Sequence, residues 1–261
     1  MDTHGKVSRE IREQLYLIGL DRNAKRNAFD SYMIEDLSAA LTEYENNPEL
    51  RCAVIFAHGE HFTAGLDLLQ LQDKISTGVF HFNQDQIDPW GVAGRKRTKP
   101  VVVAVQGTCY TAGIELMLNA DVVIASTDCR FAQLEVQRGI MPFGGASVRF
   151  VRAAGWQKAM PYLLTGQHFD AQTAQDLNLV SDVVTPDALQ QRAIEMATQI
   201  ANAAPLGVQA LLKSALTAQS DGEDAAFAQL HQALAPLFNS DDAREGVMAM
   251  LQKRVPNFQG K

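Results

Sequence analysis

The segment Val101-Val-Val-Ala-Val-Gln-Gly-Thr-Cys-Tyr-Thr-Ala-Gly-Ile-Glu-Leu-Met-Leu-Asn-Ala-Asp-Val-Val-Ile-Ala125 holds two apolar runs separated by small and polar residues. Each run has the length of a strand and is almost continuously apolar, which is typical of a strand buried on both faces of a sheet. Between the runs, a short helix is predicted to start near Ala112. Strand, helix and strand in this order predict a mostly parallel sheet crossed by helices.

The same order of elements continues toward the N-terminus. Residues 14–20 and 52–57 read as further strands, the second of them buried on both faces. A helix that ends near residues 46–48 is predicted between these strands, because its apolar residues recur at helical spacing (Ile34, Leu37, Leu41 and Tyr44). A helix could also open at Leu66. Residues 73–99 are polar and irregular, so we expect the most mobile region there, with one helix just before Lys99-Pro100.

From about Ala146 onward, the chain is predicted to be helical. Its expected helices span residues 149–164, 171–177, 187–201, 205–218, 223–238 and 241–253. Apolar stripes such as Leu230, Leu234 and Leu237 require cover, either from the sheet domain or from a neighbouring subunit. The predicted organisation is therefore an α/β core over residues 1–200 and a helical C-terminal region over residues 201–261.

Composition narrows the possible partners. The chain has 261 residues, of which 46% are hydrophobic and 20% charged, as in an ordinary soluble globular protein. Its net charge of −7 argues against nucleic acid as the main partner, because phosphate binding needs a basic surface. The local cluster of Arg95, Lys96, Arg97 and Lys99 could hold a phosphorylated cofactor or could be a solvated face.

The cysteines and histidines give no sign of a disulfide framework or of a metal site. Cys52, Cys109 and Cys129 are an odd number without paired spacing. His58 and His61 flank a loop without nearby ligand partners at useful spacing. The N-terminus shows no secretory or organellar presequence, and no apolar run is long enough to cross a bilayer. We therefore expect a cytoplasmic protein that needs no metal.

Two glutamates, Glu115 and Glu135, lie in segments that otherwise read as buried structure. Glu115 follows the first valine-rich run, and Glu135 ends Phe131-Ala-Gln-Leu-Glu135. A carboxylate is seldom buried without a partner or a task. If both converge on one cavity, their like charges shift their pKa values apart, which is the property of an acid–base pair.

Two loops lead from buried strands straight into helices, at 62–67 and 111–115. Ligands of open α/β sheets bind beyond the carboxyl ends of the strands. The small residues in these loops allow backbone N–H groups to approach a ligand oxygen, as an oxyanion hole requires. The alternative is that Ala-Gly simply makes a tight turn in each loop.

The chain resembles the crotonase (enoyl-CoA hydratase/isomerase) superfamily over nearly its whole length. The matching pieces lie in order and at the right spacing: Ala64-Gly-Leu-Asp-Leu68, Lys99 to Gly107, Ala112-Gly-Ile-Glu-Leu116, Asp121, Phe131 to Glu135, Gly139-Ile-Met-Pro142, Leu164-Thr-Gly166 and Asp242-Ala-Arg-Glu-Gly246. The resemblance implies an α/β core built as a spiral of ββα repeats. It also implies a helical C-terminal region that assembles trimers or pairs of trimers.

The resemblance further implies an enoyl-CoA hydratase, which adds water reversibly and in syn fashion to a 2-enoyl-CoA. Leu66 and Ala112 would supply the oxyanion-hole N–H groups, Glu115 would take a proton from water, and Glu135 would deliver one to C2. No cofactor is implied, because CoA is part of the substrate. The residues implied to surround that substrate are Lys25, Ala64, Gly65, Asp67, Gly113, Pro142, Phe143 and, from a neighbouring subunit, Phe258.

Three positions depart from the family pattern. Ala112 stands where a triple glycine usually continues, Phe143 stands where glycine follows the proline, and Leu66 stands where small residues are common. All three bring bulk near the reacting carbons. The alternatives are a double-bond isomerase, which typically keeps only the carboxylate matching Glu135, another acyl-CoA lyase or hydrolase on this scaffold, and a non-catalytic or RNA-binding homologue.

Overall fold

The computed structural model describes residues 4–76 and 82–261, and its central element is a six-stranded sheet. The strand order is β1-β2-β3-β4-β6-β9, with β1 antiparallel to β2 and all other neighbours parallel. A second sheet has the order β5-β7-β8. The strands span Lys6–Arg12 (β1), Leu15–Asp21 (β2), Cys52–Ala57 (β3), Val101–Val105 (β4), Thr108–Tyr110 (β5), Val122–Ser126 (β6), Arg130–Ala132 (β7), Phe169–Asp170 (β8) and Asp182–Val184 (β9).

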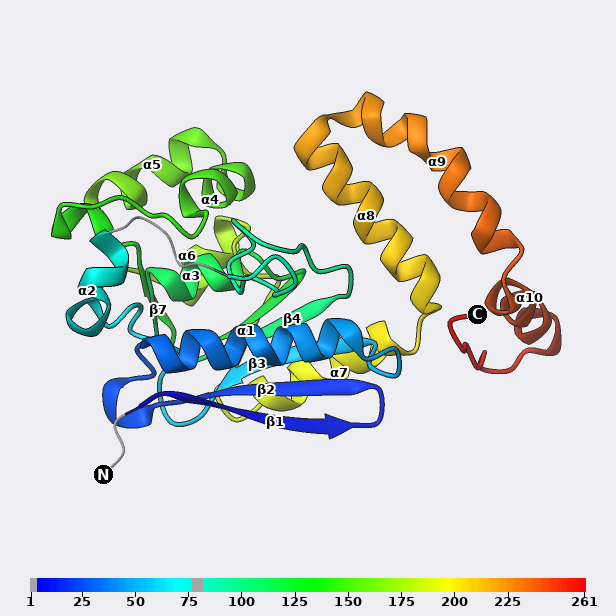
Figure 1. Cartoon of the computed structure of the whole chain (residues 1–261), viewed down its shortest axis with the longest axis horizontal. Coiled ribbons are helices and arrows are strands. Elements are labelled where there is room, and N and C mark those ends of the chain that lie inside the picture. Colours follow the sequence, from blue (N-terminus) through cyan, green and yellow to red (C-terminus); the bar gives the residue numbers. More distant parts are fainter. Residues whose placement is uncertain (1–3, 77–81) are drawn as a thin grey trace.

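Helices fill the connections between the strands (Figure 1). The α-helices span Ser31–Asn46 (α1), Leu68–Ser76 (α2), Ala112–Met117 (α3), Ala146–Ala154 (α4), Trp156–Thr165 (α5), Ala171–Asp176 (α6), Leu189–Ala201 (α7), Pro205–Asp221 (α8), Glu223–Phe238 (α9) and Asp241–Gln252 (α10). Two short 3-10 helices cover Asn23–Lys25 (η1) and Glu135–Arg138 (η2).

A strand of the large sheet, a strand of the small sheet and a helix recur in this order. β4 is followed by β5 and α3, and β6 by β7, η2 and α4. After β3 the second strand is reduced to one parallel bridge between Thr63 and Cys109, and α2 follows. The expected ββα repeat is therefore confirmed, and it brings the ends of three repeats to one side of the core.

The central strands are buried on both faces, as their unbroken apolar sequences predict. On β4, Val101, Val103 and Val105 belong to the main hydrophobic cluster, whereas Val102 and Ala104 face a second cluster beneath α7. Residues of α7 such as Ala193 and Ala197 pack into this second cluster. A polar residue in the middle of such a strand would lie unpaired in one of the two cores.

One predicted helix is wrong and another is divided. Residues 82–100 form turns and bends without a helix, because the Asp88 carboxylate accepts the backbone N–H groups of Trp90, Val92 and Ala93. The helix predicted over 149–164 is two helices, separated at Gly155, whose φ of +79° is not helical. The predicted mobility of residues 77–81 lies outside the described residues.

The other predicted helices and strands are confirmed to within a few residues. β1 was missed because its sequence, Lys-Val-Ser-Arg-Glu-Ile-Arg, is mostly polar and forms an exposed edge of the sheet. Asp30 caps the N-terminus of α1, because its side chain accepts the N–H of Met33 at 2.9 Å. The carboxylate of Asp30 also lies 3.3 Å from the guanidinium of Arg22.

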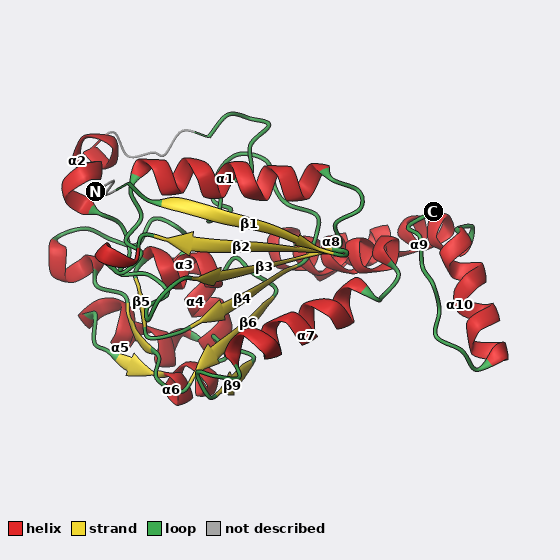
Figure 2. Ribbon diagram, turned by 90° about the horizontal axis from the view of Figure 1, so that it is seen from below, coloured by secondary structure: helices red, strands yellow, loops and turns green. Residues whose placement is uncertain are grey.

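The last three helices extend away from the sheets (Figure 2). They expose large apolar side chains: Leu211, Leu216, Phe227, Leu230, Leu234, Phe238, Val247, Met248, Met250 and Leu251. α7 ends at Ala201 and packs on the sheet, while α8 begins at Pro205. The division into residues 1–200 and 201–261 stays a prediction. Among the described residues, no helix has both the length and the apolar composition needed to cross a bilayer.

All three cysteines are buried free thiols. Cys52 lies on β3, Cys109 on β5, and Cys129 just before β7. Burial raises the pKa of Cys52 and of Cys129 to about 12 and raises the pKa of Cys109 well above its usual range. The three thiols therefore pack as small buried side chains.

Candidate active site

The two loops predicted to form an oxyanion hole lie directly against each other. Gly65 has a φ of +92°, and a Cβ placed there would lie 1.9 Å from the Thr111 side-chain oxygen. Thr111 itself has a φ of +50°, an uncommon conformation for a β-branched residue. Backbone strain of this kind persists where surrounding structure enforces it, and it occurs often at ligand sites.

The backbone N–H groups of Leu66 and Ala112 are both available to a ligand. On either side of Leu66, Phe29 donates to the Gly65 carbonyl and Asp67 donates to the Phe29 carbonyl, each at 2.8 Å. Ala112 is the first residue of α3, where an N–H has no acceptor within the helix. Across residues 4–76 and 82–261, neither N–H donates to a protein acceptor.

A cavity of about 70 Å³ brings four of the predicted site residues together. Leu66, Ala112, Glu115 and Phe143 line it. The remaining lining residues are Phe82, Asp88, Trp90, Val92, Ala93 and Gly144. The wall is mostly apolar, with Asp88 and Glu115 as its carboxylates, and Phe143 contributes its ring to it. The cavity is small because three of its walls carry the bulky or methyl-bearing residues predicted from the sequence.

Glu115 is held by the loop that precedes α4. Its Oε1 accepts the N–H groups of Gly144 at 2.7 Å and Ala146 at 3.0 Å. The side chain is buried, which raises its pKa, while these two N–H groups and the charge of Arg149 act in the opposite direction. Residue 144 has to be small, because a Cβ there would lie 2.6 Å from Glu115 Oε2.

Glu135 opens η2 and has a less polar environment. Gln133 donates to its Oε1 at 2.9 Å, and Oε2 is buried without a hydrogen-bond partner in the described part of the chain. Burial first, and then the charge of Glu115, raise the pKa of Glu135 to about 7. The two carboxyl groups therefore interact, and one of them can hold a proton near neutral pH.

Trp90 and Asp88 belong to the site but were not predicted. The indole Nε1 of Trp90 donates to the Ala112 carbonyl at 2.9 Å, so Trp90 connects the cavity wall to the first turn of α3. Asp88 fixes the turn that carries Trp90. These residues lie in the irregular segment, where no periodic pattern marks them. The turn sequence Asp88-Pro-Trp-Gly91 was the one available signal.

The remaining predicted substrate residues lie around these loops. Lys25 is exposed on η1, and the next residue, Arg26, accepts the N–H of Ala64 at 2.9 Å. Asp67 forms an ion pair with the buried Arg22 guanidinium at 2.9 Å, and this contact fixes the loop at 62–67. Gly113 is buried against Thr63, and Pro142 is buried next to Phe143.

Phe258 is not brought to the cavity of its own chain. Its ring lies near Gly246 of α10, and its carbonyl accepts Arg51 Nη2 at 2.6 Å. Arg51 precedes β3, so this contact is at the opposite end of the strands from the loops that carry Leu66 and Ala112. A role for Phe258 at a neighbouring subunit's site stays a prediction.

The basic cluster has mostly structural partners. Arg97 pairs with Asp121 at 2.7 Å, and Arg95 lies 3.9 Å from Glu45. Lys99 is buried and donates to the carbonyls of Tyr44 and Asn47 near the end of α1. Three of the four cations therefore hold the chain together, which favours the structural interpretation of this cluster over a phosphate site.

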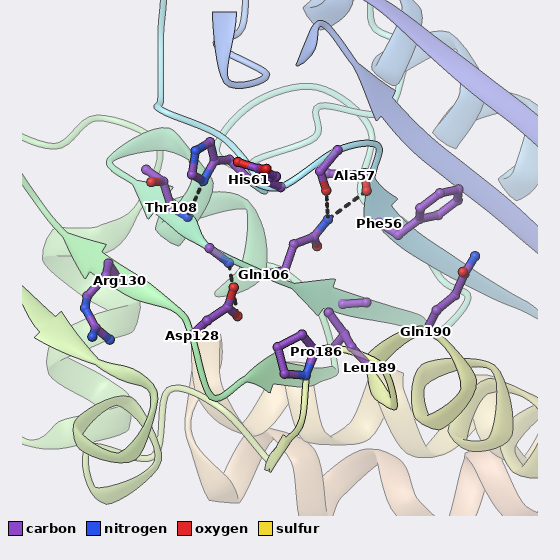
Figure 3. Close-up of a pocket in the computed structure, with 14 residues that line it drawn as sticks. Phe56, Ala57, His61, Gln106, Thr108, Asp128, Arg130, Pro186, Leu189 and Gln190 are labelled. Carbon is purple, nitrogen blue, oxygen red and sulfur yellow. Dashed lines mark hydrogen bonds between the residues drawn. The ribbon is translucent and has the colours of Figure 1, made fainter. Parts of the chain in front are cut away.

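A second cavity, of about 610 Å³, lies between the ends of β3 and β4 and the start of α7 (Figure 3). Gln106 donates to the carbonyls of Ala57 and Gly59, and the Thr108 N–H donates to His61 Nδ1. None of the predicted site residues lines this cavity. Among the described residues, no group of three or more His, Cys, Asp or Glu could hold a metal ion.

Comparison with known proteins agrees with this architecture. A sequence profile described as Enoyl-CoA hydratase/isomerase matches residues 10–261. The chain is 33% identical to enoyl-CoA hydratase EchA19 of Mycobacterium tuberculosis, covering 97% of this chain and 96% of that protein. It is also 33% identical to 2,3-dehydroadipyl-CoA hydratase of Escherichia coli, covering 98% of each.

A solved structure gives the same result. The crystal structure of a probable enoyl-CoA hydratase/isomerase from Mycobacterium abscessus matches with a TM-score of 0.96 at 45% identity, covering 99% of this chain and 100% of that chain. The chain belongs to the enoyl-CoA hydratase/isomerase family. The resemblance drawn from the motifs is thereby confirmed, together with the fold class that it implied.

Proposed function

We propose that this protein is an enoyl-CoA hydratase. It adds water across the 2,3 double bond of a 2-enoyl-CoA thioester, with the hydroxyl on C3 and a hydrogen on C2, to give a 3-hydroxyacyl-CoA. The observation that carries the proposal is that buried Glu115 lines one cavity with Leu66 and Ala112, whose backbone N–H groups are unpaired within the described residues, while a second buried glutamate, Glu135, interacts with its charge. Relatives named as hydratases at 33% identity support it.

In this proposal the thioester carbonyl lies between Leu66 and Ala112. As water attacks C3, negative charge develops on the thioester oxygen as an enolate. The two N–H groups stabilise this charge, and because the loops are already in place, little reorganisation is needed during the reaction. Removal of one donor of this kind typically raises the barrier by ~2.7–4 kcal/mol.

The two glutamates divide the proton transfers. The N–H groups of Gly144 and Ala146 stabilise the carboxylate form of Glu115, so in this proposal Glu115 takes the proton of the attacking water. Glu135, whose pKa is raised to about 7, holds a proton near neutral pH and delivers it to C2. After product release, exchange with solvent restores both states. No metal and no redox cofactor is needed.

The rest of the substrate is the CoA moiety, which we expect to bind along Lys25 and Ala64. Lys25 is exposed and has no ion-pair partner within the described residues, so its ammonium group is available to a phosphate. Gly65, Asp67, Gly113 and Pro142 shape the loops rather than contact phosphate. The cytoplasm stays the expected location on the sequence grounds given above.

The test follows the absorbance of the enoyl thioester with short, medium and branched acyl-CoA substrates. A hydratase removes the absorbance and yields 3-hydroxyacyl-CoA, with oxygen-18 from labelled water at C3. An isomerase yields a 3-enoyl-CoA without labelled oxygen. A homologue that only binds RNA gives no turnover and retains RNA on a filter at moderate salt. Either of the last two results contradicts the proposal.

Phe143 is expected to limit the size of the acyl group. Because its ring lines a cavity of about 70 Å³, Phe143→Gly should extend activity toward longer and branched enoyl groups. The side chain is 39% exposed, so the stability loss should be smaller than the ~3–5 kcal/mol typical of a buried phenylalanine. The kcat/KM over an acyl-chain series measures the first effect, and the melting temperature measures the second.

Met141→Gly is the matched control for the Phe143 variant. It adds the same backbone freedom to the same loop, and Met141 is exposed and does not line the cavity. The acyl-chain profile of the control should equal that of the unmodified protein. If Phe143→Gly leaves the profile unchanged and mainly lowers the melting temperature, Phe143 serves packing and not substrate selection.

The proposed assembly is a trimer or a pair of trimers, formed through α8, α9 and α10. These helices expose many large apolar side chains, including Phe238 and Leu251 at 74% and 68% exposure. Light scattering at micromolar concentration should therefore give a multiple of 28.6 kDa. Phe238→Ser with Leu251→Ser should lower this mass, whereas Leu69→Ser on α2 should not. A mass of one chain for the unmodified protein contradicts the proposal.

A further inference from the structure

Arg149 connects the two segments that build the cavity. It lies on α4, and its Nη1 donates to the carbonyls of Trp90 at 2.7 Å and Gly144 at 3.2 Å. Its Nη2 donates to the carbonyl of Gly91 at 3.1 Å. Trp90 and Gly91 lie in the irregular segment, whereas Gly144 lies in the loop before α4. One guanidinium therefore fixes the distance between two loops that have no regular secondary structure.

Each of these loops holds a different part of the proposed chemistry. Arg149 binds the carbonyl of Gly144, and the N–H of the same residue donates to Glu115. Trp90, whose carbonyl Arg149 binds, donates its indole N–H to the Ala112 carbonyl. Arg149 is thus connected through a single intervening residue to Glu115 (through Gly144) and to Ala112 of the oxyanion hole (through Trp90).

We propose that Arg149 is a positioning residue for the hydration reaction. Through its contacts with Gly144 and Trp90, it fixes the position of Glu115 relative to Ala112. This inference rests on the proposed function. Arg149 does not line the cavity itself, so it acts through these neighbours and not on substrate. The planar fork of arginine reaches three carbonyls from two loops, which a lysine ammonium group on a flexible stem reproduces poorly.

The position of the guanidinium has a second consequence for Glu115. Three charged groups face that carboxylate: Arg149 from α4, Glu135 from η2 and Asp88 from the irregular segment. Glu135 and Asp88 are acids, so Arg149 is the cation of the set. Its loss should make Glu115 harder to ionise and should shift the acidic limb of the pH–rate profile to higher pH.

The experiment compares Arg149→Lys with Arg149→Met. Both should lower kcat by about 10- to 100-fold with a smaller effect on KM, because the groups that act in the transition state are misplaced. Only Arg149→Met should also move the acidic limb upward, since Arg149→Lys keeps the charge. Arg152→Met, one turn along the same helix and exposed, should stay within about twofold of the unmodified protein.

Gly145→Ala tests the same contact without removing the arginine. A Cβ at residue 145 would lie 2.5 Å from Arg149 Nη1, so it should displace the guanidinium and lower kcat while leaving the charge in place; the φ of +107° adds backbone strain, which the melting temperature measures. This variant and Arg149→Lys carry the test if Arg149→Met does not fold. Melting temperatures of all variants show which of them are folded at the assay temperature.

Each result has a definite meaning. If the unmodified protein lacks hydratase activity, the proposed function fails, and the inference fails with it. If that activity is present but folded Arg149→Lys and Gly145→Ala keep kcat within about threefold, a loss smaller than misplacement produces, Arg149 does not position the site. If Arg149→Met is folded and less active but its pH profile is unchanged, its role is structural support only.

Discussion

Glu115→Gln and Glu135→Gln are each expected to lower the rate of hydration by at least about 100-fold and to leave the fold intact. A glutamine has nearly the same shape as a glutamate but cannot accept or deliver a proton at neutral pH. In Glu115→Gln the amide oxygen can still accept the N–H groups of Gly144 and Ala146. Single-turnover hydration of the best substrate measures the effect.

Glu45→Gln is the control for these two variants. Glu45 is also buried, and it accepts the N–H and hydroxyl of Thr98 away from the cavity. Its replacement should change stability but not the rate of the chemical step. Near-normal turnover in Glu115→Gln or Glu135→Gln would remove that residue from the acid–base pair.

Glu135→Gln should also stabilise the protein above neutral pH. The pKa of Glu135 rises from an ordinary 4.5 to about 7 on folding, so the folded protein binds this proton more tightly than the unfolded chain. The contribution of Glu135 to stability is therefore fully present below pH 4.5 and is lost as the pH rises through about 7. Melting temperatures at acid and alkaline pH should show the variant gaining stability over the unmodified protein only at the higher pH.

Gly65→Ala should cause the second largest loss of activity, by about 100-fold, because it separates the two oxyanion-hole loops. The new Cβ would lie 1.9 Å from the side-chain oxygen of Thr111, next to Ala112, so one loop has to move. The strained φ of +92° should add about 1–3 kcal/mol of destabilisation. Steady-state kinetics and thermal unfolding of the same preparation measure both quantities.

Gly222→Ala separates these two effects. Gly222 has a nearly identical φ of +94°, and a Cβ there meets no atom within 4 Å. The control should therefore show the destabilisation from backbone strain without the loss of activity. Equal activity in both variants would mean that the contact between Gly65 and Thr111 does not determine the distance between the Leu66 and Ala112 N–H groups.

The strands of the sheet core could be predicted from the sequence, because a strand buried on both faces has an unbroken run of apolar residues. Val101–Val105 and Cys52–Ala57 have no polar residue, and each carries side chains into two separate clusters. The two glutamates were found for the same reason, as charges inside otherwise apolar segments. The strand Lys6–Arg12 has no such run, because an edge strand exposes most of its side chains.

The parts of the site that could not be predicted depend on hydrogen bonds from side chains to backbone groups. Asp88 replaces the regular bonds of a helix with three bonds of its own, so the expected helix before Lys99 does not form. Arg149 binds carbonyls 58 and 59 positions away along the chain. Neither set of contacts follows from periodicity, and those of Arg149 also need the tertiary structure to be known first.

Because all three thiols are buried, their rate of chemical labelling measures unfolding of the protein. Alkylating reagents react with thiolates, and in the folded chain the raised pKa values of Cys52, Cys109 and Cys129 keep these groups protonated as well as shielded. Labelling then requires an opening of the structure, and its rate follows the population of open molecules. Because Cys52 lies on the large sheet and Cys109 on the small one, the order in which they are labelled tells which sheet separates first.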